Sequence, residues 1–274
     1  MKLITVIPHY NSLDQLGDAL LSIQNQTTKP DEIFIYDDCS TIVSKHDFNN
    51  LTREYKLQIK LIFLKKNIGQ SNIRIKSLKF ILDKFNGEIM IHYLDADDMI
   101  NEKFYEYSLR LYSKSNRVIS YSYTPFSDPS ETSLNQSIKF NSKLTNSFFL
   151  KQGSPSRNII FFKDSNGFSI PKNLNYRVRY EDWIFMSLFK KNNFEFKKSK
   201  MKLSFYRRIL KYKSSTSNVI VPFSELNNIS SLIGYLCPEF EKKAKFLLIL
   251  QEIKKLRFTF YSLLNSLFEK NYNR

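Results

Sequence analysis

Three carboxylates stand within four residues in the segment Asp95-Ala96-Asp97-Asp98. In extended backbone Asp95 and Asp97 project to the same side, because side chains of alternate residues share a face. Such a pair suits a hard divalent cation, Mn²⁺ or Mg²⁺, that keeps open positions for diphosphate oxygens. The alternative is an Asp-rich strand end in which Asp98 forms a turn or caps a helix. The segment alone leaves both interpretations open.

A second acidic pair, Glu181-Asp182, stands directly before Trp183 and the apolar run 184–189. A carboxylate acts as a general base when its affinity for protons is raised, which burial and a neighbouring carboxylate provide. The alternative is the start of a helix, where acidic side chains interact favourably with the helix dipole. Trp183 is the only tryptophan, and it suits stacking on an acceptor sugar and packing in the core equally well.

Hydrophobic periodicity indicates the elements that position these residues. Buried strands are expected at 3–7, 32–36, 59–64 and 88–94, and helices at 13–26, 72–85 and 102–112. The first strand is expected to stop at Pro8. The alternation of strands and helices predicts an α/β fold with a mostly parallel sheet and flanking crossover helices.

Polar residues follow four of the expected strands directly, at 8–11, 37–40, 67–69 and 95–98. The carboxyl ends of parallel strands lie at one edge of a sheet, and ligands bind beyond that edge. The four clusters are therefore expected to converge. This convergence indicates a binding site more strongly than any one cluster does.

The rest of the chain has weaker patterns. Residues 113–150 are rich in Ser and Asn and are expected to be irregular, or to form weak strands around 118–123. A second ordered block is expected from 156 to 206. Apolar spacing then predicts a long amphipathic helix over 240–270, whose polar faces carry lysines; its apolar residues are Phe246, Ile249, Leu250, Ile253, Leu256, Phe260, Leu264 and Leu267.

The charge is concentrated in the last third of the chain. The 274 residues suffice for one large α/β domain with an appendage, and the formal net charge is +16. Residues 190–274 carry 18 basic and 6 acidic side chains. This excess indicates an anionic partner: a membrane surface, a nucleic acid or a phosphorylated substrate. No nucleic acid is expected, because the charge comes without a recognition-helix or base-stacking motif.

The two cysteines, Cys39 and Cys237, form no CxxC pair. No disulfide framework or zinc site is therefore expected, which fits a reducing cytosol. The N-terminal apolar run is too short for the core of a signal peptide. No stretch approaches the roughly 18 apolar residues of a membrane span. A cytoplasmic protein is expected, either free or on the inner face of the membrane.

Six short motifs occur in order along residues 1–217. They are Val6-Ile7-Pro8-His9-Tyr10-Asn11, Ser22-Ile23-Gln24-Asn25-Gln26-Thr27, the run EIFIYDDCST from Glu32 to Thr41, Asn67-Ile68-Gly69 with Arg74, Leu94-Asp95-Ala96-Asp97-Asp98, and Glu181-Asp182-Trp183. Each motif is weak alone, but the ordered set resembles the family-2 glycosyltransferases. The resemblance implies the nucleotide-sugar-binding GT-A fold and transfer of a sugar from a nucleotide donor.

The resemblance implies a role for each matching position. The implied donor-binding residues are Pro8, Tyr10, Asn11, Asp38, Asn67, Gly69, Arg74, Asp95 and Ala96. Among them, Asp38 corresponds to the residue that holds a uracil ring, and Arg74 to a residue near the base. Asp95 corresponds to a contact with the ribose or the donor sugar.

The metal ligand and the catalytic group are also implied. Asp97 corresponds to the metal ligand on the diphosphate, with Asp95 as a second ligand. Asp182 corresponds to the catalytic base and Glu181 to an acceptor contact. Trp183, Arg207 and Arg208 are implied on the acceptor or phosphate side.

The sequence departs from the family pattern at two places. Many relatives carry a His after a Tyr-Arg pair near the metal, but none follows Tyr206-Arg207-Arg208. Either Asp97, water and the diphosphate complete the metal shell, or Arg207, Arg208 and Lys211 offset phosphate charge in place of a ligand. Cys39 replaces the usual Gly, and an altered turn beside the base pocket is expected.

Together these observations predict a catalytic domain at 1–217 and a basic helical extension at 218–274. Within the domain, 1–112 is expected to bind the nucleotide sugar and 113–217 the acceptor. The expected function is metal-dependent, inverting transfer from a UDP-sugar to a hydroxyl of a saccharide, lipid-linked, in bacterial capsule, O-antigen or lipooligosaccharide synthesis. The segment 240–274 resembles a helix lying in an anionic bilayer interface. The alternative is that it packs on the catalytic domain or on a second subunit of a homo-oligomer.

Two other classes of function stay open at this stage. A nucleotidyltransferase also uses Asp pairs with Mg²⁺, but it usually has a Gly-rich phosphate loop near the N-terminus, and 7–11 contains no glycine. A non-catalytic protein that binds an anionic surface or a nucleic acid would explain the charge alone.

Overall fold

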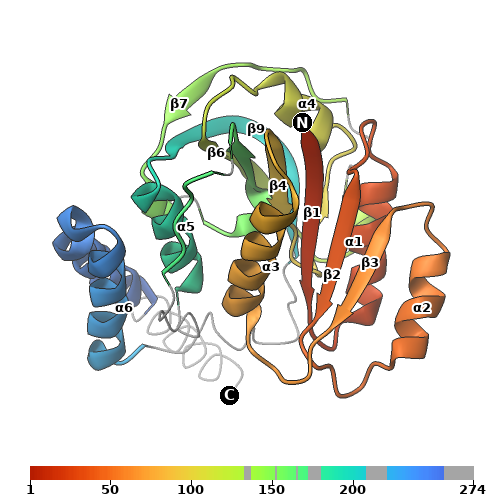
Figure 1. The fold of residues 1–274 in the computed structure, drawn as a ribbon, viewed down its shortest axis with the longest axis horizontal. Helices are drawn as coiled ribbons and strands as arrows, with labels where there is room; N and C mark the ends of the chain where they lie inside the picture. Colours follow the sequence, from red (N-terminus) through yellow and green to blue (C-terminus); the bar gives the residue numbers. More distant parts are fainter. Residues whose placement is uncertain (133–136, 152, 165, 172–179, 208–220, 256–274) are drawn as a thin grey trace, which may run out of the picture. The chain divides into compact units, whose positions relative to one another are not determined.

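Figure 1 shows the computed structural model, which describes residues 1–132, 137–151, 153–164, 166–171, 180–207 and 221–255. The chain forms two compact units. The first comprises 1–177 with 181–208 and contains the sheet; the second comprises 178–180 with 209–274. The predicted boundary at residue 217 falls in 208–220, outside the described residues, and stays a prediction.

The strands of the described residues form one sheet. They are β1 (Lys2–His9), β2 (Glu32–Asp37), β3 (Ile59–Phe63), β4 (Ile89–Tyr93), β5 (Met99–Ile100), β6 (Arg117–Phe126), β7 (Leu144–Asn146), β8 (Asn158–Phe162) and β9 (Glu195–Arg207). Their order is β3-β2-β1-β4-β8-β6-β9-β5, with β7 beside β9. The first four strands pair in parallel, whereas β8 is antiparallel to β4. The predicted mostly parallel sheet with flanking helices is thus confirmed.

Helices cover both faces of this sheet (Figure 1). The helices of the first unit are α1 (Leu13–Gln24), α2 (Lys45–Arg53), α3 (Gln70–Lys84), α4 (Phe104–Arg110) and α5 (Glu181–Lys191). Helices α1, α2 and α4 share one apolar core with odd-numbered residues of β1 and β2, such as Leu3 and Ile33. On the opposite face, Tyr93 of β4 meets Phe185 of α5 with ring centroids 5.1 Å apart. Burial on both faces explains why the parallel strands are continuous apolar runs.

The first strand runs further than expected. It continues through Pro8 to His9, and Pro8 is paired with Tyr36 of β2. Pairing of β1 with β4 ends at Val6 and Tyr93, two residues before the proline. Pro8 therefore lies beyond the end of the β1–β4 pairing. The N–H group that proline lacks would have no partner in β4, so its absence removes no hydrogen bond between these two strands.

The second half is more regular than its composition indicates. Strand β6 has ten residues and pairs with both β8 and β9, so the strand alternative for 118–123 is confirmed and the irregular one is wrong there. Three 3₁₀ turns also lie here: η1 (Pro129–Glu131), η2 (Phe149–Lys151) and η3 (Pro155–Arg157). Helix α2 was not predicted. Its signal is a capping box, in which Ser44 and Asp47 satisfy each other's backbone N–H groups.

The second unit is helical where it is described. It contains α6 (Phe223–Leu236), the turn η4 (Pro238–Phe240) and a helix over 241–255. This last helix buries Ala244, Leu248 and Glu252, whereas Phe246 and Ile253 of the predicted apolar stripe are exposed. The rest of the predicted helix, 256–270, lies outside the described residues. In the described part of the chain, no helix combines the length and the apolar character that a bilayer span requires.

His92 links the sheet to the turn that precedes β8. The ring is fully buried, and its Nε2 atom donates to the carbonyl oxygen of Ser156 at 2.8 Å. The Nδ1 atom lies 3.0 Å from the hydroxyl of Tyr105, which in turn lies 2.7 Å from Oγ1 of Thr5. Burial lowers the pKa of His92 to about 4, so the ring is neutral at pH 7.

The stability of the protein should therefore depend on pH through His92. Its pKa is about 4 in the folded state and near 6.5 in the unfolded state, so protonation favours unfolding as the pH falls from 6.5 toward 4. Replacing His92 with Gln should lower the free energy of unfolding at pH 7.5 by about 1–3 kcal/mol. By pH 4.5 the wild type should lose about 2.5 kcal/mol of stability relative to the variant, so that the difference between the two proteins disappears or reverses. Urea denaturation at four pH values measures the free energy of unfolding of both proteins. If the difference between them did not change with pH, the titration of His92 would not contribute to stability.

Candidate active site

The loops that follow β1, β2, β3 and β4 are joined by hydrogen bonds at one edge of the sheet. The Asn11 side chain accepts the backbone N–H of Thr41 at 2.9 Å, and Asn67 donates to the carbonyl of Asp38 at 3.2 Å. Gln70, the next residue after the third cluster, donates to the carboxylate of Asp95. All four polar clusters are thus connected, which confirms their predicted convergence.

Two residues of these loops have left-handed backbone. Asn11 has φ 53° and Cys39 has φ 62°. Asn tolerates this region, whereas most side chains are strained there and Gly is not. The turn at position 39 therefore requires a conformation that suits Gly, which explains why the motif that the sequence resembles has Gly at this place.

Asp38 fixes the start of α3. Its two carboxylate oxygens accept the backbone N–H groups of Ile68 at 2.7 Å and Gly69 at 2.9 Å. Gly69 precedes the first turn of α3 with φ 84°. The side chain is buried, and its negative charge lies at the positive end of the helix dipole. The uracil contact implied for Asp38 stays a prediction.

Arg74 joins the acids of the two halves of the domain. The residue is 1% exposed; its Nη2 atom donates to Oδ1 of Asp95 and its Nη1 atom to Oδ1 of Asp182, each at 2.7 Å. Oε1 of Glu181 lies 3.7 Å from Nη1. The guanidinium that was expected near the nucleobase thus lies between carboxylates that are more than 80 residues apart in sequence.

Asp95 is held from three directions. Besides Arg74 and Gln70, Ser154 donates to its Oδ2 atom at 2.9 Å. Its backbone N–H donates to Oγ of Ser156 at 2.8 Å. Because three side-chain donors occupy its two oxygens, Asp95 has less capacity to ligate a cation than Asp97 has.

Asp97 and Asp98 hold unfavourable negative charge. Burial, and then the charge of Asp95, raise the pKa of Asp97 to about 6. Burial, and then the charges of Asp97 and Asp95, raise the pKa of Asp98 well above its usual range. A nearby positive charge would relieve both effects, because it stabilises the ionised forms.

Arg207 braces the loop that carries these acids. Its backbone N–H donates to Oδ1 of Asp98 at 3.1 Å, and its Nε atom donates to the carbonyl of Asp97 at 2.9 Å. Its Nη2 atom lies 2.5 Å from Oδ2 of Asp18 on α1, and its side chain is 8% exposed. These contacts hold the loop in place and leave little of Arg207 for the predicted phosphate contact. Arg208 and Lys211 lie outside the described residues.

Asp182 has the protonation behaviour that a general base requires. Enclosure by protein raises its pKa most; Arg74 lowers the pKa, and Asp95 and Glu181 raise it, so that it reaches about 7. The side chain keeps 32% of its surface exposed. Burial likewise raises the pKa of Glu181. An Asp with a pKa near 7 can accept a proton at neutral pH and hold it in an intermediate.

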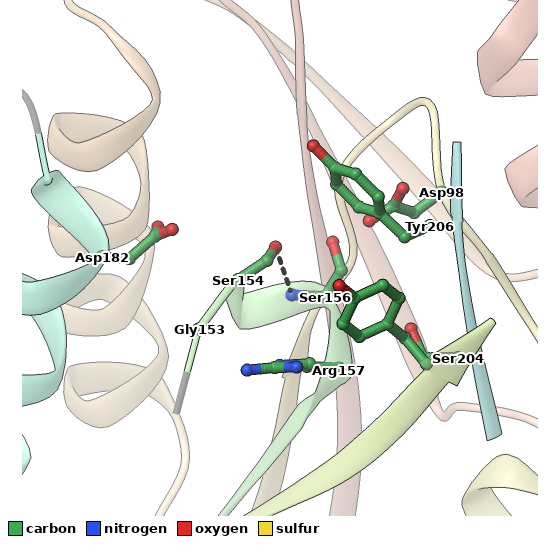
Figure 2. A pocket seen from close by; sticks show the side chains of 9 residues that line it. Asp98, Gly153, Ser154, Ser156, Arg157, Asp182, Ser204 and Tyr206 are labelled. Carbon is green, nitrogen blue, oxygen red and sulfur yellow. Dashed lines mark hydrogen bonds between the residues drawn. The ribbon is translucent and has the colours of Figure 1, made fainter. Parts of the chain in front are cut away.

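A cavity of about 380 Å³ opens beside Asp182. Figure 2 shows Asp182 on α5 at one side and Asp98 with Tyr206 at the other, while Ser154, Ser156 and Arg157 lie between them. The described residues that line it are Asp98, Tyr123, Gly153, Ser154, Ser156, Arg157, Asp182, Ser204 and Tyr206. The cavity is large enough for a sugar ring or two and small for a whole nucleotide sugar.

Several lining residues escaped the sequence analysis. Tyr123, Ser154, Arg157 and Ser204 belong to segments without a recognisable motif, and β6, η3 and β9 bring them together. The local signal that could have pointed to one of them is the Gly153-Ser154-Pro155 turn, because Gly and Pro mark a tight loop.

The remaining predicted site residues divide by exposure. Tyr10 is 47% exposed and available for contact with a ligand. Pro8 is buried within β1, and Ala96 is buried in the loop after β4. Trp183 is 7% exposed within α5, so the structure favours the packing alternative over stacking on a sugar.

The acids after β4 suit a hard divalent cation in their chemistry. Oxygen ligands with excess negative charge are what Mn²⁺ and Mg²⁺ prefer, and the raised pKa of Asp97 marks charge that a cation would neutralise. Asp97 would hold the ion, with Asp98 beside it. Within the described residues, however, no three His, Cys, Asp or Glu side chains come together as a metal-binding group. A site of this kind would therefore take further ligands from water and from a bound phosphate.

The fold defines an α/β protein of the GT-A type, with a mostly parallel sheet and flanking helices. The family model described as glycosyl transferase family 2 matches residues 5–209. The chain belongs to glycosyltransferase family 2.

Relatives of known sequence are similar over part of their length. An uncharacterized glycosyltransferase of Haemophilus influenzae is 32% identical over 129 residues, which make up 47% of this chain and 49% of that protein. The poly(ribitol-phosphate) beta-N-acetylglucosaminyltransferase TarP of Staphylococcus aureus is 32% identical over 120 residues, 42% of this chain and 34% of that one. An uncharacterized glycosyltransferase of Rickettsia felis is 30% identical over 149 residues, 54% and 22% of the two chains. The chain thus covers less than half of each of these relatives.

Solved structures share the fold. The S. aureus TarS fragment 1–349 in complex with UDP-GlcNAc superposes with a TM-score of 0.63 at 18% identity, over 93% of this chain and 73% of that one. The mannosyltransferase PcManGT of Pyrobaculum calidifontis in complex with GDP-Man and Mn²⁺ superposes with a TM-score of 0.55 at 11% identity, over 99% and 79%.

Removing the charge of Arg74 should destabilise the protein, because it leaves Asp95 and Asp182 close together without a cation. Arg74→Met should lower the free energy of unfolding by about 3–5 kcal/mol. The free energy of unfolding of Arg74→Lys should lie between those of the wild type and Arg74→Met. An ammonium group keeps the charge, but it lacks the planar fork with which a guanidinium binds both carboxylates. Urea denaturation measures the effect against Arg53→Met, a matched change at an exposed position of α2. Equal transition midpoints for Arg74→Met and Arg53→Met would show that the bridge contributes nothing.

Proposed function

We propose that this protein is an inverting hexosyltransferase that moves a sugar from a UDP-sugar to a hydroxyl group of a saccharide acceptor. The observation that carries the proposal is Asp182, which has a pKa of about 7 and lines a sugar-sized cavity opposite the acids after β4. Membership of glycosyltransferase family 2 supports it. The complexes of TarS with UDP and with UDP-GlcNAc support a uridine nucleotide as the donor.

In the proposed reaction Asp182 accepts the proton of the acceptor hydroxyl. The oxygen forms a bond to the anomeric carbon from the face opposite the leaving group. The bond from that carbon to the diphosphate oxygen breaks, and UDP leaves with both electrons of the bond. Arg74 holds Asp182 in position, because its Nη1 atom donates to the carboxylate while Asp95 anchors the other end of the guanidinium.

The donor is assigned to the loops at the carboxyl edge of the sheet. The proposed contacts are Pro8, Tyr10, Asn11, Asp38, Asn67, Gly69, Asp95 and Ala96. A Mn²⁺ or Mg²⁺ ion, when bound, would supply positive charge for the diphosphate leaving group. Asp97 is the proposed ligand, with Asp95 or Asp98 beside it. Glu181 is proposed to contact the acceptor.

The acceptor is proposed to be a saccharide of the bacterial envelope, lipid-linked at the inner face of the cytoplasmic membrane. The name of TarP and that of a teichoic acid poly(glycerol phosphate) polymerase of Staphylococcus epidermidis, 26% identical over 194 residues, support an envelope polymer. The segment 240–274 is proposed to meet an anionic membrane surface; Phe246 and Ile253 are exposed there on a helix that also carries lysines. Binding to a second subunit is the alternative.

Asp182→Asn should abolish sugar transfer and spare donor binding. An amide cannot accept the proton, whereas its shape preserves the cavity. UDP release from UDP-GlcNAc, the donor named with TarS, should fall by about 10²–10⁴-fold, while the calorimetric Kd for UDP stays within a factor of about three of the wild-type value. In the wild-type protein the rate should rise with pH through about 7, as the base ionises. Lost UDP affinity would assign Asp182 a structural role, and release of pyrophosphate instead of UDP would indicate nucleotidyl transfer.

Asp97→Asn should weaken the response to metal ions. Wild-type protein treated with EDTA should lose activity, and Mn²⁺ should restore it. The variant should need a concentration of Mn²⁺ at least about tenfold higher, because one charged oxygen ligand is gone. Titration of UDP release with Mn²⁺ measures the shift, and Asp83→Asn, a change of the same kind on α3, provides the control. Equal Mn²⁺ dependence of Asp97→Asn and wild type would exclude Asp97 as the ligand.

A further inference from the structure

Two aromatic side chains and one cation line the cavity beside Asp182, and no motif of the sequence includes this set. Tyr123 of β6 and Tyr206 of β9 are 39% and 43% exposed, with ring centroids 5.8 Å apart. The guanidinium carbon of Arg157 lies 5.3 Å from the centre of the Tyr123 ring. Exposed aromatic rings at this separation offer apolar faces to the C–H surface of a sugar, while their hydroxyl groups stay available for hydrogen bonds.

Arg157 occupies a place that the backbone keeps free for it. Gly153 has φ 69°, and a Cβ atom added there would lie 2.0 Å from Nη2 of Arg157. Any larger residue at 153 would therefore displace the guanidinium. The surrounding protein also lowers the pKa of Arg157, since burial outweighs the attraction of Tyr123 and Asp182. A guanidinium in such surroundings is stabilised by an anionic ligand group, because a charge-assisted hydrogen bond is stronger there than in water.

The strand that supplies Ser204 and Tyr206 to the cavity carries further positive charge. On β9, Lys198, Lys200 and Lys202 are exposed at alternate positions. In the described part of the chain none of the three forms an ion pair with an acid. At about 3.3 Å per residue, the nearest of them lies about 13 Å along the strand from Tyr206. The strand that lines the cavity therefore also carries three exposed positive charges.

We propose that this cavity is an acceptor subsite for a polyanionic saccharide, in which Arg157 binds a phosphate or carboxylate group of the acceptor and the tyrosines hold the adjoining sugar or polyol unit. The inference rests on the proposed function and adds the chemical class of the acceptor. The lysines of β9 attract the rest of the charged chain.

The position of Asp182 assigns the cavity to the acceptor rather than to the nucleotide. A general base must lie within hydrogen-bonding reach of the hydroxyl group that it deprotonates, and Asp182 is part of the cavity wall. Six of the eight residues proposed to contact the donor lie at or just after the ends of β1, β2 and β3, and the other two, Asp95 and Ala96, precede Asp98 in the loop after β4. None of the eight is among the described residues that line the cavity. Asp98 marks its boundary toward the diphosphate side.

Binding of labelled oligomers tests the proposal without relying on turnover. The probes are a fluorescent poly(glycerol phosphate) oligomer, an oligogalacturonate and maltohexaose, which carry phosphate, carboxylate and no charge respectively. Fluorescence anisotropy gives the affinity in the presence of UDP. Wild-type protein should bind at least one anionic oligomer about tenfold or more tightly than maltohexaose, and the anionic arm that binds more tightly identifies the group.

Two variants alter the cavity by different means. Arg157→Gln removes the charge and Gly153→Ala displaces it, and each should weaken anionic binding by about tenfold or more while leaving maltohexaose unchanged. The triple variant Lys198→Gln, Lys200→Gln, Lys202→Gln should reduce the salt dependence of anionic binding. Its control removes three exposed lysines away from β9, namely Lys56, Lys79 and Lys114. Circular dichroism verifies that each variant is folded.

The outcomes separate this inference from the proposed function. The subsite proposal would be overturned if the wild type bound anionic and neutral oligomers with equal affinity, or if neither cavity variant affected anionic binding. In either case, binding of UDP would still support the proposed glycosyltransferase function. If Arg157→Gln lost affinity for UDP but still bound the anionic oligomers, Arg157 would belong to the donor site, and the acceptor subsite would again be overturned. Arg157-dependent anionic binding in a protein that fails to bind UDP would support the subsite and contradict the proposed function.

Discussion

The buried guanidinium of Arg74 is the interaction on which the site depends. It lies on α3, holds Asp95 after β4 and reaches Asp182 at the start of α5. Removing a charge from water is costly unless partners compensate it, so a buried Arg requires these carboxylates and keeps them in place. The loop after β4 and the start of α5 are therefore coupled through one side chain. A change in the position of α3 would move the proposed base as well as the loop that is proposed to hold the donor.

The arrangement of acids around Arg74 also explains their different roles. Asp95 receives the guanidinium and other donors, so its charge is compensated within the protein. Asp97 and Asp98 have raised pKa values, because burial and mutual repulsion are not offset to the same degree. Asp182 has a pKa of about 7, because burial outweighs its ion pair with Arg74. One cluster thus contains an acid held by protein donors, two buried acids whose chemistry suits a cation, and the acid proposed as the base.

The cavity shows where sequence patterns lose their predictive value. The N-terminal strands, the three helices and the convergence of loops at one edge were predicted, because buried parallel strands and amphipathic helices have strong local signals. Helix α2 was not predicted, and for β6 the sequence left open whether the segment is irregular or a strand. The residues that shape the cavity, such as Tyr123 and Arg157, come from β6 and η3, where composition resembles that of a loop. Their proximity results from pairing between strands far apart in sequence.

The sequence by itself determined the fold class, the order of its motifs and the identity of the acids at 95–98 and 181–182. Those features are local, since they depend on periodicity and on neighbouring residue types. The tertiary structure alone decided which acids share a cation, since Arg74 lies more than 100 residues from Asp182 and its motif implied a contact near the nucleobase. It also decided that Trp183 packs inside and that Arg157 faces the cavity. Burial and long-range charge pairing set these outcomes, and neither is encoded in any short stretch of the chain.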